Sequence, residues 1–516
     1  MRHAAATDLG AGRIVPVVMR CLLSCLLFFF PLYSGVAADW SDEVVYFVLI
    51  DRYADGDSGN NRGVERRNPG GFHGGDLRGL TQQLDELAEL GITALWINPV
   101  QKQIAQCPYA NAPAKLGLAE FRHCGFHGYW IDDFETLDAH FGTLADLKLL
   151  VDEAHKRHIK VLLDVVYNHA GYGSRYASRR AADGQSWLRT GEGNCDVDPV
   201  SCSVGGLPDF RTELPEVRDY LLQANIDLSK QAGVDGFRLD TYKHVSTDFW
   251  LEHRRRTRAE LGRDFFLLAE HWGGDAASLD PYFARDEVDA GFDFGFKGNC
   301  ESFANGRGRA VAYGSYLASR HKVRKGYLLA HYLSSHDEAM ALSNLHNDRD
   351  KFRLCAAIQL TSLGLPVIYY GEEVARAGSE WPLNRTDMPW GARDILPGKG
   401  KVRDETLRAW YKQLLHIRRH HPALRRGDYT LLSGAQDKWL AYVRSDAASG
   451  DSILVLVNRE DSEAAVDLML PAAWHGKPLL DELQHAALPP SGDTLQLRLA
   501  PASVRIFGIA SGKAGR

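Results

Sequence analysis

The sequence predicts a (β/α)₈ barrel with a loop-rich insertion after its third strand and a separate C-terminal antiparallel β-sandwich domain. Three observations predict this fold. From about Val44 to Tyr370, short runs rich in β-branched and aromatic residues alternate with amphipathic helical runs, a pattern typical of βαβ units and parallel sheets. The alternation repeats eight times, as in a barrel. After His421-Pro422 the helical period disappears and alternating strand patterns remain.

Each predicted barrel strand is a short apolar run. The eight runs are Val44–Ile50, Ala94–Pro99, Lys160–Val166, Gly236–Asp240, Phe265–Glu270, Gly291–Phe296, Leu328–Ser334 and Pro366–Tyr370. Apolar residues at helical spacing predict helices between them, including Leu77–Leu90, Leu144–Arg157, Pro215–Ala232 and Asp350–Leu363. A doubly wound open sheet is the alternative, but no Gly-x-Gly-x-x-Gly turn follows the first strand.

These patterns divide the chain into five segments. They are a signal peptide (1–38), the first part of the barrel (39–170), an insertion rich in Gly, Ser, Arg and Asp (171–214), the second part of the barrel (215–420), and the C-terminal domain (421–516). In the C-terminal domain the predicted strands are Leu431–Val443, Ile453–Val457, Ala465–Leu470 and Leu495–Ile506.

The N-terminal segment has the pattern of an export signal. An apolar run, Cys21–Tyr33, follows Arg20 and precedes the small residues Gly35-Val-Ala-Ala38. The run is shorter than the roughly 20 residues that a spanning helix needs. We expect a secreted or periplasmic protein that leaves the membrane once the signal is removed; a lipoprotein anchored at Cys25 is the alternative.

Composition narrows the class of protein further. Apolar residues make up 45% and charged residues 24%, which is typical of globular proteins. The net charge of −6 supplies no positive electrostatic field that would attract nucleic acid. We also expect the protein to be a monomer.

The cysteines suit an oxidising compartment. Cys107 and Cys124 bracket one long loop and Cys195 and Cys202 bracket another, so we expect two local disulfides, whereas Cys355 lies in an apolar helical run and is expected as a buried thiol. Metal ligation is the weaker alternative, because no Cys-x-x-Cys or clustered Cys/His spacing is present.

Polar residues collect at the carboxyl ends of the predicted strands, where barrel active sites form. The third strand ends in Asp164-Val-Val-Tyr-Asn168-His169 and the fourth in Arg238-Leu-Asp240, with Lys243-His244 shortly after. Glu270 ends the fifth strand, and His336-Asp337 follows the seventh. Four such ends together predict a catalytic site.

The spacing of these residues indicates glycoside hydrolysis. Arg238 and Asp240 are two apart on a strand and therefore point to the same side, where the guanidinium keeps the carboxylate ionised. Glu270 follows Phe-Phe-Leu-Leu-Ala, an apolar setting that raises a carboxyl pKa and suits a general acid. A pair of carboxyls in contrasting environments is what glycosidases use. A structural ion pair is the alternative for any one of them.

These stretches resemble the signature regions of the α-amylase superfamily, glycoside hydrolase family 13, and occur in the same order. His127-Gly-Tyr129-Trp130, Leu207-Pro-Asp209-Phe210 and Gly364–Glu372 match it as well. The resemblance implies a retaining hydrolase of α-1,4-glucosidic bonds in starch and maltooligosaccharides, most like an α-amylase. Alternatives are a transglycosylase, a cyclomaltodextrinase or neopullulanase of the same superfamily and, more remotely, a non-catalytic glucan-binding protein.

The resemblance also implies roles for individual residues. Asp240 corresponds to the nucleophile, Glu270 to the general acid/base and Asp337 to the third catalytic carboxylate. The residues that would bind the α-glucan are Arg238, His169, His336, Tyr129, Trp130, Lys243, His244 and Arg385. Arg385 ends Pro382-Leu-Asn-Arg385, which is similar to the family's Asp-Pro-x-Asn-Arg loop but lacks its Asp.

Calcium is implied at two places. By resemblance, Asn168, Asp209 and the backbone carbonyl of His244 would share one ion, and oxygen ligands suit Ca²⁺. A second calcium loop would use Asp55, Asp57, Asn60, Asn61, Gly74 and Asp76. A solvated Asx turn is the alternative for this second loop.

Overall fold

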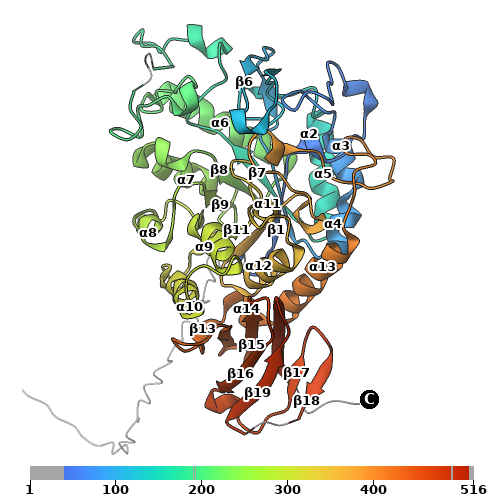
Figure 1. Ribbon diagram of the computed structural model, residues 1–516. Helices are drawn as coiled ribbons and strands as arrows, with labels where there is room; N and C mark the ends of the chain where they lie inside the picture. The colour runs from blue at the N-terminus through green and yellow to red at the C-terminus, as the bar shows by residue number, and fades with distance from the viewer. Residues whose placement is uncertain (1–39, 190, 192, 490–491, 511–516) are drawn as a thin grey trace, which may run out of the picture. The chain divides into compact units, whose positions relative to one another are not determined.

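Eight parallel strands close into a barrel, as the sequence predicts (Figure 1). The computed structural model describes residues 40–189, 191, 193–489 and 492–510, so the predicted signal peptide lies outside the described residues. Around the barrel the strands follow the order β1, β12, β11, β10, β9, β8, β7, β2. Their bounds are β1 Val45–Val48, β2 Ala94–Ile97, β7 Lys160–Val165, β8 Gly236–Leu239, β9 Phe266–Ala269, β10 Ala290–Phe292, β11 Leu328–Tyr332 and β12 Leu365–Tyr369.

Helices connect successive strands. They are α2 Ile50–Tyr53, α3 Leu77–Gln82, α4 Leu84–Leu90, α5 Leu144–Lys156, α6 Pro215–Ala232, α7 Thr247–Glu260, α8 Ala276–Ala284, α9 Gly295–Ala304, α10 Ala310–Ser319, α11 Ala341–Asn344, α12 Arg349–Thr361, α13 Glu405–His420 and α14 Pro422–Arg426. The predicted helix 215–232 is confirmed to the residue: Pro215, which needs no amide partner, begins α6, and left-handed Gly233 ends it.

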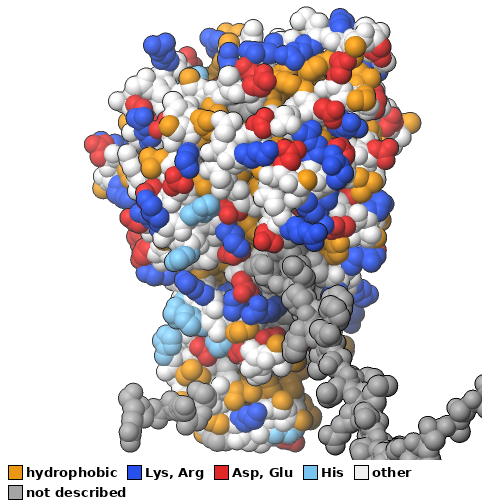
Figure 2. Space-filling model, turned by 180° about the vertical axis from the view of Figure 1, so that it is seen from behind, with side chains coloured by type: hydrophobic (Ala, Val, Ile, Leu, Met, Phe, Trp, Pro, Cys, Tyr) orange, Lys and Arg blue, Asp and Glu red, His pale blue; other side chains and the backbone are white. Residues whose placement is uncertain are grey.

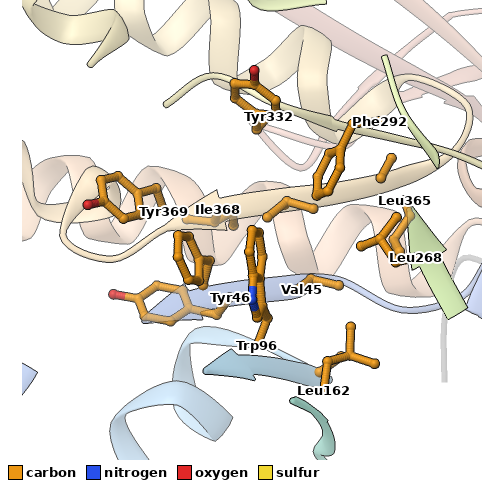
Figure 3. Packing of buried hydrophobic residues seen from close by; sticks show 14 of the residues in the cluster. Val45, Tyr46, Trp96, Leu162, Leu268, Phe292, Tyr332, Leu365, Ile368 and Tyr369 are labelled. Carbon is orange, nitrogen blue, oxygen red and sulfur yellow. The ribbon is translucent and has the colours of Figure 1, made fainter. Parts of the chain in front are cut away.

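Large side chains fill the interior of the barrel. Phe47 of β1 stacks on Trp96 of β2 with ring centroids 3.6 Å apart, and Trp96 in turn lies 5.8 Å from Phe292 of β10. Figure 3 shows the Trp96 and Phe292 rings pointing toward one another from different strands. Because these rings fill the barrel interior, we expect a ligand to bind above it, at the carboxyl ends of the strands.

Two barrel elements differ from the prediction. The apolar spacing of Leu77–Leu90 continues across a kink at Gln83, which separates α3 from α4, so the pattern could not reveal the break. The strand predicted as Gly291–Phe296 ends at Phe292, because Asp293 accepts a hydrogen bond from the Gly295 amide where the chain turns into α9.

The predicted insertion is largely irregular. Its described residues include the short 3₁₀ turns η3 Arg175–Ser178 and η4 Val204–Gly206 and isolated bridges such as His169–Asp209. Its disulfide joins Cys195 to Cys202, as predicted. An excursion follows β2 as well, in a region that the sequence analysis assigned to the barrel. It comprises β3 Gln101–Gln103, β4 Tyr109–Ala110, η2 Ala114–Leu116, β5 Phe121–Arg122 and β6 Ile131–Leu137.

The other thiols also match their prediction. Cys107 and Cys124 form the second disulfide, within the excursion after β2. Cys355 is a buried free thiol in the described chain, and so is Cys300.

The C-terminal domain is made of antiparallel strands, as predicted. One sheet has the order β13, β14, β15, β20, β17, β18, and a two-stranded sheet pairs β16 with β19. The bounds are β13 Asp428–Leu431, β14 Leu440–Asp446, β15 Asp451–Asn458, β16 Ala464–Met469, β17 Leu479–Asp481, β18 Ala486–Leu488, β19 Thr494–Leu499 and β20 Ser503–Ile509. Trp439, Leu454 and Phe507 lie in its own hydrophobic core.

Two of the predicted C-terminal strands each span two observed strands. The run 431–443 covers the end of β13 and the start of β14, because Gly434 and Asp437 form a turn between them. The run 495–506 covers β19 and most of β20, because Pro501 lacks the amide that a sheet hydrogen bond needs and Ala502 has a positive φ of 41°.

The molecular surface carries both signs of charge. Figure 2 shows basic and acidic side chains interspersed over the visible face. Lys412 and Arg408, for example, both pair with Glu89. Among the described residues, no helix is long and apolar enough to cross a membrane.

A buried arginine joins the C-terminal domain to the barrel. Arg444 of β14 donates to the carbonyl oxygens of Thr361 (2.7 Å), Leu424 (3.2 Å) and Gly427 (2.7 Å), and its side chain is fully buried. Burial raises the cost of its charge and lowers its pKa to about 10.

We expect Arg444→Met to lower the free energy of unfolding by about 2–4 kcal/mol, because it leaves several buried carbonyl groups without donors. Urea unfolding followed by circular dichroism measures the effect. Arg498→Ala, at an exposed pair with Glu463 in the same domain, is the matched control and should change stability by less than about 0.5 kcal/mol. If the two variants lowered the free energy of unfolding equally, Arg444 would not stabilise the contact between the C-terminal domain and the barrel.

Candidate active site

Arg238 is the centre of the charged cluster in the mouth of the barrel. Its Nη1 donates to Asp240 Oδ1 at 2.6 Å and to Asp164 Oδ1 at 2.9 Å, and its Nη2 lies 3.5 Å from Glu270 Oε2. These residues come from β7, β8 and β9, which are neighbours in the barrel, and Asp164 is directly in register with Arg238. One buried guanidinium therefore holds three carboxyl groups together.

A sharp backbone turn positions Glu270. Thr241, directly after Asp240, has left-handed φ and ψ of 47° and 40°, which is uncommon for a β-branched residue. The turn brings the Thr241 amide to Glu270 Oε2, where it donates a hydrogen bond of 2.6 Å. Backbone strain of this kind is found where the surrounding structure needs one particular geometry.

The two predicted catalytic carboxyls, Glu270 and Asp240, lie in different electrostatic surroundings. Burial, with further contributions from the charges of Asp240 and Asp337, raises the pKa of Glu270 to about 8, although Arg238 opposes the shift. Asp240 has the shortest contact with the guanidinium, at 2.6 Å. Glu270 is thus held protonated near neutral pH, as a general acid must be. Asp240, the predicted nucleophile, lies beside it and is paired with the arginine.

Asp337 and His336 reach the cluster from the loop after β11. Burial alone would raise the pKa of Asp337, but His336, Arg385 and Arg238 outweigh it and lower the pKa below its usual range. His336 Nε2 lies 3.3 Å from Asp337 Oδ2, and Arg385 Nη2 donates to Asp337 Oδ1 at 3.2 Å. Arg385, at the end of η8 Leu383–Arg385, is therefore in the site despite the missing family Asp.

Tyr129 and His169 also lie in this cluster, but Trp130 does not. The Tyr129 hydroxyl donates to Asp164 Oδ2 at 2.8 Å, and its ring lies nearly parallel to His336 with centroids 5.3 Å apart. His169 is buried, and its Nε2 has no hydrogen-bond partner among the described residues. Trp130 packs one layer further out, against Tyr172 and the imidazoles that precede it in the chain.

Lys243 and His244 lie on the 3₁₀ turn η5 Tyr242–His244, which follows Asp240. His244 Nδ1 donates to the carbonyl of Pro199 at 2.8 Å, so its side chain holds the insertion. Burial lowers the pKa of His271, which directly follows Glu270, and the charge of Lys243 lowers it further.

The structure adds residues that the sequence analysis did not select. A cavity at the mouth is lined by Glu270, Asp337, Trp272, Phe294 and Tyr332, and Trp272 is 46% exposed. Trp272 comes two residues after Glu270, a signal that was available in the sequence.

Asp164 is a second residue of the site that the sequence analysis did not select, and it has more contacts within the charged cluster. It accepts hydrogen bonds from Arg238, Tyr129 and Trp96 Nε1 (3.1 Å), and burial raises its pKa to about 7. Its position at the end of the third predicted strand was visible in the sequence, but its pairing with Arg238 depends on the register between β7 and β8.

The first predicted calcium ligands converge where the insertion meets the barrel. One of the two terminal atoms of the Asn168 side-chain amide lies 2.8 Å from the His244 carbonyl oxygen and 3.2 Å from Asp209 Oδ1. With the amide oxygen in that position three oxygens meet, the donor set that calcium prefers. Arg189 pairs with the other oxygen of Asp209 at 2.5 Å, yet burial still raises the pKa of Asp209 to about 7. The Asp209 oxygen that Arg189 does not contact, Oδ1, is the one that faces Asn168, and it fits a bound cation.

The second predicted calcium loop also brings its residues together. Asn61 Nδ2 donates to Asp55 Oδ2 at 2.7 Å, and Asn60 Nδ2 donates to Asp76 Oδ2 at 3.3 Å. The side-chain oxygens of both asparagines are buried and lack a hydrogen-bond partner in the described part of the chain. A Cβ on Gly74 would lie 2.3 Å from Asn61 Oδ1, so only glycine allows this approach.

The alternative considered for this loop, an Asx turn, is present at Asp57, whose side chain accepts from the Gly59 amide at 2.9 Å. It does not account for the two unpaired amide oxygens, which are ligands of the kind that calcium takes.

Comparisons with known proteins agree with this geometry. A family model described as the alpha amylase catalytic domain matches residues 47–190 and 200–413, and one described as the maltogenic amylase C-terminal domain matches residues 429–506. Similar proteins include a cyclomaltodextrinase of Geobacillus thermopakistaniensis, which is 29% identical and aligned over 92% of this chain and 78% of the relative. A periplasmic alpha-amylase of Escherichia coli is 30% identical over 76% of this chain and 69% of the relative.

A solved structure is similar over nearly the whole fold. The alpha-amylase from Geobacillus thermoleovorans, complexed with acarbose, aligns with a TM-score of 0.76 and 30% identity over 92% of this chain and 99% of that one. The match of the catalytic-domain model to most of the barrel, the closed parallel barrel and the C-terminal β domain together show that the chain belongs to the α-amylase family of glycoside hydrolases.

Proposed function

We propose that the protein is a retaining hydrolase of α-1,4-glucosidic bonds that acts on cyclomaltodextrins, pullulan and maltooligosaccharides. The observation that carries the proposal is the pairing of Asp240 and Glu270 through one guanidinium, with the pKa of Glu270 raised. Family membership makes the reaction class glycoside hydrolysis, and the site supplies one carboxyl with a raised pKa, Glu270, beside another, Asp240, that the arginine contacts directly.

In this mechanism Asp240 attacks the anomeric carbon while Glu270 protonates the departing oxygen, which gives a covalent glycosyl-enzyme. Water, deprotonated by Glu270, then resolves the intermediate, so that two inversions retain the α configuration. Arg238 positions the Asp240 carboxyl for attack through a hydrogen bond of 2.6 Å, and the Thr241 amide holds the Glu270 carboxyl in place. Asp337 and Arg385 would bind sugar hydroxyls in the cleavage subsite, together with His169 Nε2 and His336 Nδ1, which have no hydrogen-bond partner among the described residues.

The similar proteins support cyclodextrin- and pullulan-type substrates over starch alone. They include several cyclomaltodextrinases, a neopullulanase of Thermoactinomyces vulgaris and a maltogenic alpha-amylase of Bacillus acidopullulyticus, and the C-terminal domain matches the maltogenic amylase model. A starch-cleaving α-amylase, the main expectation from sequence, is the second candidate, because solved alpha-amylases align over 92% of the chain. A transglycosylase uses the same carboxyls and differs in the acceptor that resolves the intermediate.

Calcium and export are part of the proposal. An ion held by Asn168, Asp209 and the His244 carbonyl would supply positive charge that ties the insertion to the barrel, and a second would order the Asp55–Asp76 loop.

Two disulfides support a secreted or periplasmic location, because such bonds persist in oxidising compartments.

A substrate panel tests the proposal. We expect the purified protein to hydrolyse β-cyclodextrin and pullulan with a higher kcat/KM than soluble starch, and proton NMR in the first minutes should show α-anomeric products. Faster turnover of starch would favour the α-amylase alternative, and products longer than the substrate would indicate transglycosylation.

Asp240→Asn is the matched control for this panel, since the amide has the same shape but cannot form the glycosyl ester. Its kcat should fall by several powers of ten, about 5 kcal/mol or more in barrier, while circular dichroism stays unchanged. A first product with β configuration would contradict the double displacement.

The pH profile tests the role of Glu270. A general acid works only while protonated, so kcat/KM should fall as the pH rises through about 8, the raised pKa of Glu270. α-Maltosyl fluoride, whose leaving group needs no proton, should show a weaker alkaline decline. Glu270→Gln should lose turnover of maltooligosaccharides yet keep formation of the glycosyl-enzyme from the fluoride. An alkaline limb that persists in Glu270→Gln would assign it to another group.

Chelation tests the calcium sites. EDTA should lower the melting temperature, because an ion bound only by the folded state stabilises it by about 2.7 kcal/mol at a hundredfold excess over its Kd. Elemental analysis should find two calcium ions in the wild type and one in either Asp209→Asn or Asp76→Asn. Superimposable melting curves with EDTA and with calcium, and no bound metal, would refute both sites.

A further inference from the structure

A second cavity lies at the end of the barrel opposite the candidate active site, where α13 meets the C-terminal domain. It has a volume of about 690 Å³, and its lining includes Leu90 and Gly91, which precede β2 and therefore lie at the amino ends of the strands. Figure 2 shows histidine side chains gathered on the left of the view, near the C-terminal domain. Four histidines line the cavity, which we call the histidine groove: His416, His420, His421 and His485.

A turn of the C-terminal domain is fixed against α13 beside the groove. Gln413 Nε2 donates to the carbonyl of Leu483, in the turn between β17 and β18, at 2.7 Å. His416 and His420 follow Gln413 by three and seven residues, so all three lie on one face of the helix. His485 ends the turn with a positive φ of 52°. A residue other than glycine is held in this conformation by the structure around it, and such residues concentrate at functional sites.

The two helical histidines are arranged as a chelating pair. Their rings are exposed, and the ring centroids lie 4.0 Å apart. Two imidazoles four residues apart on one face of a helix can bind the same metal ion. His420 Nδ1 donates to the His416 carbonyl at 2.8 Å, so the lone pair of its ring is on Nε2. Metal-binding histidines commonly donate their other ring nitrogen to a carbonyl in this way.

The charges in the groove keep His416 neutral and His421 positive. Burial lowers the pKa of His416, and the charges of His420 and His485 lower it further. A neutral imidazole is the form that binds metals. Burial would also lower the pKa of His421, but ion pairs with two carboxylates outweigh it and raise the pKa to about 9. His421 is therefore a structural partner, and the other three histidines are available as ligands.

We propose that His416, His420 and His485 bind a divalent transition-metal ion such as Zn²⁺, Ni²⁺ or Cu²⁺. The pair on α13 would chelate the ion, and His485 would supply the third nitrogen, so that the metal joins the barrel to the C-terminal domain. In the described residues, the ligand atoms of the three histidines do not all lie within 4.8 Å of one another. His485 closes the site by a rotamer change, which exposed side chains make rapidly. Imidazole ligands favour these metals over calcium.

Calorimetric titration of the untagged protein with nickel chloride tests the site. Excess calcium chloride is present throughout, so that the proposed calcium sites stay filled. We expect one Ni²⁺ per chain and a higher melting temperature with Ni²⁺. His416→Gln and His420→Gln should each raise the Kd more than about tenfold, because each removes half of the chelate. His485→Gln should also raise the Kd and reduce the gain in melting temperature.

His346→Gln is the matched control, because His346 is exposed, lies outside the groove and has a similar positive φ of 57°. It should bind Ni²⁺ as the wild type does. If His416→Gln/His420→Gln binds Ni²⁺ as tightly as the wild type, the ion is adventitious and the site is refuted. An unchanged Kd in His485→Gln would refute the link between the two domains. Without Ni²⁺, all these variants should keep the hydrolytic rate of the wild type, so the test does not depend on the proposed function.

Discussion

The buried guanidinium of Arg238 is the interaction on which the candidate active site depends. It has three carboxyl neighbours, Asp164, Asp240 and Glu270, and cannot neutralise them all. Burial raises the pKa values of both Asp164 and Glu270, and the neighbouring charge of Asp240 adds to each shift, although Arg238 opposes them. The proton that Glu270 would donate in catalysis is therefore retained as a consequence of how the charges are packed.

That arrangement needs a rigid support, and the barrel provides it. Arg238 and Asp240 come from one strand end, and Asp164 and Glu270 from the strands on either side. The stacked Phe47 and Trp96 rings close the floor beneath them. A displacement of about 1 Å in such a site is expensive for catalysis, and the three carboxyls that contact Arg238 lie at or next to strand ends, where the backbone is rigid.

The two disulfides belong to the two excursions from the barrel. One closes the excursion after β2, which packs on Trp381, and the other lies in the insertion, with Cys202 Sγ 3.8 Å from His244 Nδ1. Irregular segments of this kind bury little apolar surface of their own. A covalent link that limits their unfolded conformations is an effective way to keep them in place.

The sequence by itself determined the barrel, the C-terminal β domain, both disulfides and the charged residues at the strand ends. It could do so because each is a local signal: an apolar run with its terminal residue, or two cysteines in one loop. Only the tertiary structure decided that Asp164 pairs with Arg238, that Trp130 lies outside the charged cluster, and that His123 meets Trp381. Those contacts depend on strand register and on loops joined across the barrel mouth. No local sequence pattern predicts these contacts, because they form only when the barrel closes.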